Sequence, residues 1–272
     1  MSLIKFSLLM LSVWVLISGC ASRVTVQSQR VTQNILINGH DDDWEGQMQI
    51  IEKTGVAIGI RNDDDYLYLA LSPLNRGMAM QWMTAGLTVW LDSTGGKNKR
   101  FGIHFPIGLS DLGIPPMIMM GMPGERDTKR DNPLEKMSDR LLEEVEIIGP
   151  GKYDKQRIGT KESTTLQVRL THNPNGMFYE LRIPLQNDPR NVCAINTRPG
   201  KNLGIGLETG KMERGRGMPP MGEGGLGGPR GGGRPGGSRS GGRPPEMERA
   251  EPLSVWISTT LSESLKRDRK MD

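Results

Sequence analysis

The segment that decides the expected fold is VAIGIRNDDDYLYLAL, residues 56–71. Two apolar stretches, residues 56–60 and 66–71, flank the polar residues 62–65. Asn and Asp favour tight turns because their side chains hydrogen-bond to the nearby backbone, and β-branched and aromatic residues favour strands. The segment therefore predicts two antiparallel strands joined by a turn.

Further strand-like segments of similar length recur on both sides of this hairpin. They lie at residues 34–37, 87–92, 101–106, 145–148, 166–170, 177–184, 203–208 and 253–258. Turn-forming residues separate them, residues 75–85 resemble a loop, and only residues 134–142 favour a short helix. This pattern is typical of an all-β protein and predicts an antiparallel β-sandwich of the jelly-roll or immunoglobulin-like type.

The first twenty residues indicate export and lipid attachment. Lys5 precedes an apolar run at residues 6–17, which is shorter than the roughly 20 residues of a membrane-spanning helix and is typical of a secretory signal. Leu16-Ile17-Ser18-Gly19-Cys20 resembles a lipobox. We expect cleavage after residue 19 and acyl chains such as palmitate on Cys20; an ordinary signal peptide with a chance cysteine is the alternative.

The expected location is the cell envelope. No Asp follows Cys20 at the next two positions, which resembles the sorting pattern for the outer membrane of Gram-negative bacteria. The lipid anchor makes the membrane an expected partner.

The chain is expected to divide into a signal peptide (1–19), a polar lipidated tether (20–32), a sandwich domain (33–262) and a charged tail (263–272). Residues 211–250 are rich in Gly, Arg and Pro and carry eight Lys or Arg against four Asp or Glu. We expect a disordered insertion before the last strand, because each doubling of loop length costs only about 0.6 kcal/mol.

The cysteines and catalytic motifs point away from an enzyme. Cys193 is the cysteine that remains besides Cys20, so two unmodified thiols are not available for an intramolecular disulfide. Cys193 is expected to be a small buried residue. The sequence contains no GxSxG, HExxH, CxxC or P-loop motif, and we expect a binding protein without catalytic residues.

Several segments resemble, in order, sandwich domains related to carbohydrate-binding module family 9 and the DOMON group. Ile35-Leu36-Ile37-Asn38-Gly39 with Asp43-Trp44 resembles their opening motif, with Asn38 where Asp is more usual. The strands that follow in those domains are similar to residues 58–69, 86–92, 102–106 and 179–185. The resemblance covers residues 33–208 and 252–262 and implies a sandwich that binds; relatives bind sugars, and some bind haem or calcium.

Exposed aromatic side chains are the expected sugar-binding groups, because the apolar face of a sugar ring stacks on them. Trp82, in the loop-like segment, is the first candidate, and Trp44 is the second, although packing at the sandwich end is its commoner role. Trp90 and Trp256 lie inside strands and are expected in the core. The expected function is binding of a glycan or glycan-like ligand.

Two acidic loops offer a possible calcium site. Calcium takes six to eight oxygen ligands from flexible loops, and Asp41, Asp43, Asp63 and Asp65 could supply carboxylates. The alternative is that these Asp residues only form exposed turns.

Methionines offer a possible copper site, because thioether ligands select Cu(I). The candidates are Met117, Met119, Met120 and Met122, and the alternative is an adaptable apolar surface. Haem would need an axial pair such as Met with His, and the histidines are His40, His104 and His172.

The Gly/Arg tract at residues 229–243 resembles RGG segments of nucleic-acid binders. Residues 211–250 contain no Phe, Tyr or Trp for stacking, so we expect no nucleic-acid partner.

Two alternatives to glycan binding remain open. One is a structural or assembly lipoprotein of the envelope, and the other is a periplasmic copper or haem binding protein.

Overall fold

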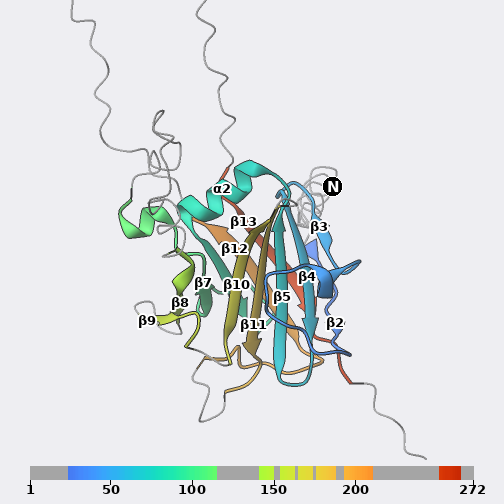
Figure 1. Ribbon diagram of the computed structural model, residues 1–272. Helices are drawn as coiled ribbons and strands as arrows, with labels where there is room; N and C mark the ends of the chain where they lie inside the picture. The colour runs from blue at the N-terminus through green and yellow to red at the C-terminus, as the bar shows by residue number, and fades with distance from the viewer. Residues whose placement is uncertain are drawn as a thin grey trace, which may run out of the picture.

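The computed structural model describes residues 24–114, 141–149, 154–162, 165–173, 176–187, 193–210 and 251–264. They form two packed β-sheets with the α-helix Arg76–Ala85 above them (Figure 1). The predicted all-β sandwich is confirmed. The predicted signal peptide, the insertion at 211–250 and the tail from residue 265 lie outside the described residues. Within the described part of the chain, no helix has both the length and the apolar character needed to cross a membrane.

The first sheet has seven strands in the order β1-β13-β12-β6-β7-β8-β9. Its bounds are β1 Val24–Thr25, β6 Leu87–Asp92, β7 Gly102–His104, β8 Glu144–Ile148, β9 Lys155–Gly159, β12 Asn202–Thr209 and β13 Ser254–Thr260. All neighbouring pairs are antiparallel except β1 with β13, which is parallel.

The second sheet has the order β10-β11-β5-β4-β2, with β3 also paired to β4. Its bounds are β2 Gln29–Arg30, β3 Gln49–Ile51, β4 Val56–Asn62, β5 Tyr66–Pro73, β10 Gln167–Asn173 and β11 Gly176–Pro184. The predicted hairpin of residues 56–71 forms its centre as β4 and β5.

Alternating apolar residues fill the space between the sheets. On β6, for example, Leu87, Val89 and Leu91 are buried and belong to the main core. Since successive strand residues point to opposite faces, Thr88, Trp90 and Asp92 lie on the outer face of the seven-stranded sheet. This outer face positions the candidate site.

The sandwich begins earlier than the sequence indicates. Val24–Thr25 pairs with β13 and Gln29–Arg30 pairs with β4, so residues 24–30 are bound to the sheets rather than forming a free tether. Val26 is buried in the core, and the Ser28 hydroxyl donates to Asn62 at 2.7 Å. Two-residue edge strands carry too little periodicity to be recognised in a polar segment.

The segment expected to be a loop contains helix α2, Arg76–Ala85. Asn75 caps it, because its side-chain oxygen accepts a hydrogen bond from the Met78 N–H at 2.8 Å, and Gly86 ends it with a positive φ of 71°. The buried Met78 and Trp82 lie four residues apart, on one face of the helix. The helix therefore closes one end of the core.

Candidate functional site

Two tryptophans lie in one row across the outer face of the seven-stranded sheet. Trp90 on β6 pairs with Gly206 on β12, and Gly206 pairs with Trp256 on β13. On its other side, Trp90 pairs with Gly102 on β7. With neighbouring strands about 4.8 Å apart, the backbones of the two tryptophans are about 10 Å apart.

Each of these rings lies against the backbone of a glycine. A Cβ atom added to Gly102 would lie 2.7 Å from the Trp90 ring, and one added to Gly206 would lie 2.9 Å from the Trp256 ring. Trp90 and Trp256 are both half-buried. The missing glycine side chains thus let two large rings lie low on the sheet while part of each ring stays exposed.

Polar contacts fix the Trp90 ring. Its indole Nε1–H donates to Glu208 Oε2 at 2.8 Å, and Lys99 Nζ lies 2.6 Å from the same carboxylate oxygen. Lys99 follows a turn that Asp92 organises by accepting hydrogen bonds from the Thr94 and Asn98 backbone N–H groups. Burial raises the pKa of Asp92, but these hydrogen bonds outweigh it and the pKa lies below its ordinary value.

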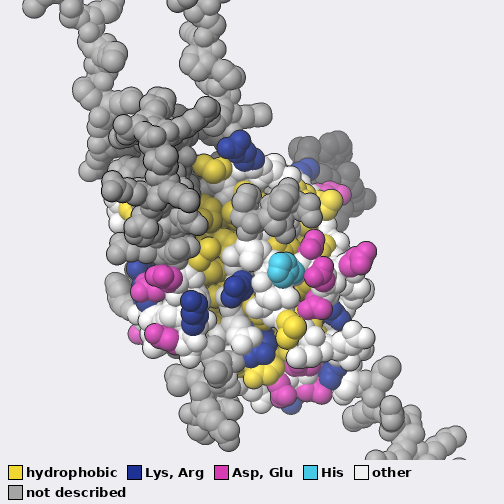
Figure 2. All heavy atoms as spheres, in the orientation of Figure 1, with side chains coloured by type: hydrophobic (Ala, Val, Ile, Leu, Met, Phe, Trp, Pro, Cys, Tyr) yellow, Lys and Arg dark blue, Asp and Glu magenta, His cyan; other side chains and the backbone are white. Residues whose placement is uncertain are grey.

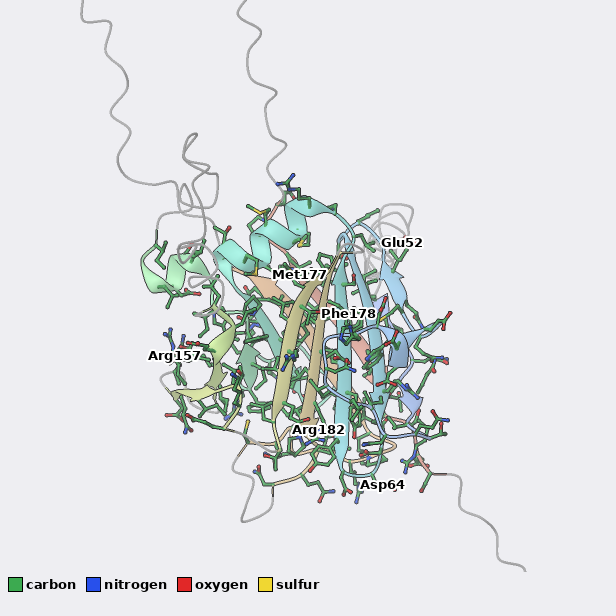
Figure 3. The ribbon with its side chains drawn as sticks, in the orientation of Figure 1. Glu52, Asp64, Arg157, Met177, Phe178 and Arg182 are labelled. Atoms are coloured by element: carbon green, nitrogen blue, oxygen red, sulfur yellow. The ribbon has the colours of Figure 1, made fainter. Side chains whose placement is uncertain are left out.

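A hollow of about 560 Å³ adjoins Trp90. Side chains of β6, β7, β8 and β9, the Lys99–Arg100 turn and the 3₁₀ helix η2, Leu109–Leu112, line it. Figure 2 shows basic and acidic side chains gathered at the edge of the molecule over β8 and β9, and Arg157 lies at this edge, away from Arg182 on the other sheet (Figure 3). The hollow therefore joins an aromatic surface to a charged one.

His104 connects two polar groups in this hollow. Its Nδ1 lies 2.9 Å from Thr88 Oγ1 and its Nε2 lies 2.9 Å from Asp111 Oδ2. The hydrogen bond with His104 lowers the pKa of Asp111 despite the opposing effect of burial. Both ring nitrogens are engaged, so His104 offers no free nitrogen to a haem iron in this arrangement.

Glu146 is the buried carboxylate of the hollow, with its side chain 9% exposed. Lys155 Nζ lies 2.7 Å from its Oε1, and Arg157 Nε lies 3.1 Å from its Oε2. Burial raises the pKa of Glu146, but the two cations outweigh it and the pKa is lowered. At neutral pH the group is therefore a carboxylate shared by two cations.

The predicted aromatic candidates do not lie at this site. Trp82 is 0% exposed and packs edge-on against Tyr179, so the prediction that it stacks a ligand is wrong; as a helical residue facing the core, it has no free ring face. Trp44 is 1% exposed, and its Nε1–H donates to Glu180 Oε1 at 2.9 Å. It also packs inside the molecule and offers no surface for stacking.

The acidic loops form turns. Asp63 accepts hydrogen bonds from the backbone N–H groups of Asp65 and Tyr66 and from the Tyr68 hydroxyl, and Asp43 accepts one from the Leu36 N–H. Asp41 provides its backbone carbonyl to the Trp44 N–H. Among the residues that the structure describes, no group of three or more His, Cys, Asp or Glu side chains could hold a metal ion.

The predicted copper ligands Met117, Met119, Met120 and Met122 lie outside the described residues. Cys193 is partly buried, and burial raises the pKa of its thiol to about 12. A second hollow of about 480 Å³ is lined by polar and cationic side chains, among them Asn187, Asn196 and Arg198. No aromatic side chain lines it.

Sequence reasoning missed Trp90 and Trp256 as surface residues. The alternation of Leu87, Val89 and Leu91 around Trp90 was the available signal, because it places Trp90 on the opposite face of its strand. Gly102 lies on the strand that follows Trp90 in the chain, but Gly206 lies 50 positions before Trp256, so no local pattern reveals the second pairing.

No family model and no curated protein matches the chain. Among solved structures, the chain is similar to a carbohydrate binding module family 9 from Caldicellulosiruptor kristjanssonii in complex with glucose, with 12% identity, a TM-score of 0.32, and coverage of 68% of this chain and 77% of that one. A second structure of this module type from the same organism, in complex with cellotriose, has 14% identity, a TM-score of 0.29, and coverage of 69% and 75%. Because both TM-scores are below 0.5, the functional argument depends on the residues of this chain.

Proposed function

We propose that this protein is a lipid-anchored glycan-binding module of the cell envelope that binds through the outer face of its seven-stranded sheet. The observation that carries the proposal is the row of Trp256, Gly206, Trp90 and Gly102. A sugar ring has an apolar C–H face and a polar rim; this row offers two half-buried indole rings, of which Trp90 lies beside charged and hydroxyl groups. The protein binds its ligand without transforming it.

A glycan array probed with the protein tests this function. Wild type is expected to bind a defined set of oligosaccharides, and Trp90→Ala or Trp256→Ala is expected to weaken that binding at least tenfold, because each removes a stacking surface. Tyr66→Ala is the matched control, since Tyr66 is a half-buried aromatic residue on the other sheet. Circular dichroism checks that each variant is folded.

Two results would contradict the glycan proposal. A folded protein that binds no oligosaccharide would instead favour a structural or assembly role. Binding that Tyr66→Ala weakens as much as Trp90→Ala does would move the site to the other sheet.

The anchor is proposed from Leu16-Ile17-Ser18-Gly19-Cys20, and the proposed location is the outer membrane of a Gram-negative bacterium. Growth with labelled palmitate should label wild type but not Cys20→Ser, and fractionation should recover wild type with the outer membrane. A labelled Cys20→Ser variant would contradict lipid attachment at this residue.

A further inference from the structure

The hollow beside Trp90 has more positive than negative charge. Its lining contains the four basic residues Lys99, Arg100, Lys155 and Arg157 and the two carboxylates Asp111 and Glu146. Glu208 adds one carboxylate beside Trp90, where it accepts from the indole N–H and pairs with Lys99. Even with Glu208 included and His104 neutral, the cations exceed the anions by one.

Several donors in the hollow remain available to a ligand. Arg157 contacts Glu146 through Nε, and its two terminal nitrogens make no hydrogen bond within the described part of the chain. Lys155 has three N–H donors and uses one on Glu146. Arg100 is exposed and forms no ion pair with any residue that the structure describes.

The buried carboxylate of Glu146 holds the Lys155 and Arg157 side chains in position. A carboxylate that is 9% exposed and held by two cations keeps Lys155 and Arg157 beside each other at the mouth of the hollow, where their side chains are 55% and 40% exposed. Arginine binds carboxylate and phosphate groups with two parallel hydrogen bonds. The arrangement suits one anionic group next to the Trp90 ring.

We infer that the hollow binds an acidic sugar unit of the glycan, with the ring of the sugar against Trp90 and its anionic group against Arg157, Lys155 and Arg100. This inference rests on the proposed glycan-binding function and specifies its ligand class. Carboxylate, sulfate and phosphate groups share the required chemistry, and the test separates them.

The experiment compares acidic oligosaccharides with their neutral parents on one array. Uronate, sulfated and phosphorylated chains are each placed beside the uncharged chain of the same linkage, with methyl-esterified uronates as a second uncharged form. We expect the acidic member of at least one pair to bind at least tenfold more tightly, and the type of that pair identifies the anionic group. Raising the salt concentration should reduce this preference.

Variants then locate the preference. Arg157→Gln and Arg100→Gln should each weaken binding of the acidic chain several-fold more than binding of the neutral chain. Arg169→Gln is the matched control, because Arg169 is exposed on β10 of the other sheet, and it should change neither value.

The outcomes separate the two proposals. Equal binding of acidic and neutral chains, weakened by Trp90→Ala, would overturn the acidic-sugar inference and leave the glycan function intact. A preference that Arg169→Gln reduces as much as Arg157→Gln does would also overturn it, since the attraction would then come from net charge. Absence of binding to every chain would overturn both proposals.

Discussion

Glu180 on β11 contacts a segment that lies more than 130 positions earlier in the chain. Its carboxylate accepts hydrogen bonds from the Trp44 indole N–H and from the backbone N–H groups of Asn38 and Gly39, and the residue is 0% exposed. Trp44 in turn lies against Gly59, where an added Cβ would be 2.7 Å from the ring. Glu180 therefore holds the segment around residues 38–44 on the second sheet.

Glu180→Gln should destabilise the protein. A glutamine presents one oxygen and one NH₂ group, so its NH₂ group would face either the Trp44 indole N–H or the two backbone N–H groups, with a donor against a donor. The expected loss is about 1–3 kcal/mol of unfolding free energy, the usual cost of unpaired buried polar groups, measured by urea denaturation. Glu52→Gln, at an exposed position, is the control; equal effects of both changes would refute the role of Glu180.

Glu146 predicts a pH dependence of stability. Its pKa in the folded protein is below the ordinary value, so the folded state binds its proton less readily than the unfolded state does. The resulting stabilisation is present above the unfolded pKa of about 4.3 and is lost as the pH falls through the folded pKa.

The measurement is the difference in unfolding free energy between wild type and Glu146→Gln. This difference should be largest near neutral pH and should shrink as the pH falls below about 4.3. A difference that stayed constant, or grew on acidification, would show that the two cations do not stabilise the ionised form of Glu146.

Among the strands, the pairing of each tryptophan with a cross-strand glycine decides whether the rings can lie low on the sheet. Gly206→Ala adds a methyl group 2.9 Å from the Trp256 ring, so the ring must lift away from β12. We expect the fold to persist with a loss of about 1–3 kcal/mol and glycan affinity to fall. Tryptophan fluorescence should report greater exposure of the ring; wild-type affinity and an unchanged spectrum would contradict this mechanism.

The long strands could be predicted well from the sequence, because each alternates apolar with polar residues or is bounded by turns. Examples are β4, β5, β6 and β11. It did not predict α2, although Asn75, the spacing of Met78 and Trp82, and Gly86 were usable signals for a helix. The strand β9, KQRIG, is mostly polar because it lies at a sheet edge, so no apolar pattern revealed it.

The site was harder to predict than the strands. The row of Trp90 and Trp256 depends on the register of three strands, in which Trp90 pairs with Gly206, 116 positions later, and Gly206 pairs with Trp256, 50 positions later still. Local apolar patterns determine which residues form a strand and which face they share, but not which distant strands become neighbours. The expected ligand class thus came from the resemblance of the sequence to sugar-binding sandwich domains. The proposed binding residues came from the register of the paired strands in the structure.

For the whole molecule, the connection between β12 and β13 is the longest segment that interrupts paired strands. Hydrogen bonds join the two ends of this connection. The Thr209 N–H donates to the Leu253 carbonyl at 3.0 Å, and the Leu253 N–H donates to Thr209 Oγ1 at 2.9 Å. The chain ends that a shorter connection must join are therefore already adjacent.

Replacing residues 211–250 with a five-residue Gly/Asn/Ser turn should leave the protein folded. The length of the loop is halved about three times, which lowers the entropic cost of closing it by about 2 kcal/mol. The thermal midpoint should therefore stay equal or rise by a few degrees. A Gly/Ser segment of the original length is the control and should match wild type. Midpoints of both variants below that of wild type would show that residues 211–250 contribute to the fold.

The position of β1 limits how far the proposed anchor lets the protein reach. Val24 enters the sheet beside β13, four residues after Cys20, and four residues span at most about 14 Å. If Cys20 carries the lipid, the sandwich would stay close to the bilayer and would bind only polymers that lie at the membrane surface. Strand β1 lies beside β13, which carries Trp256, and the cationic hollow extends to the opposite edge of the sheet at β9. A glycan bound along this face would therefore have its acidic unit farthest from the anchor.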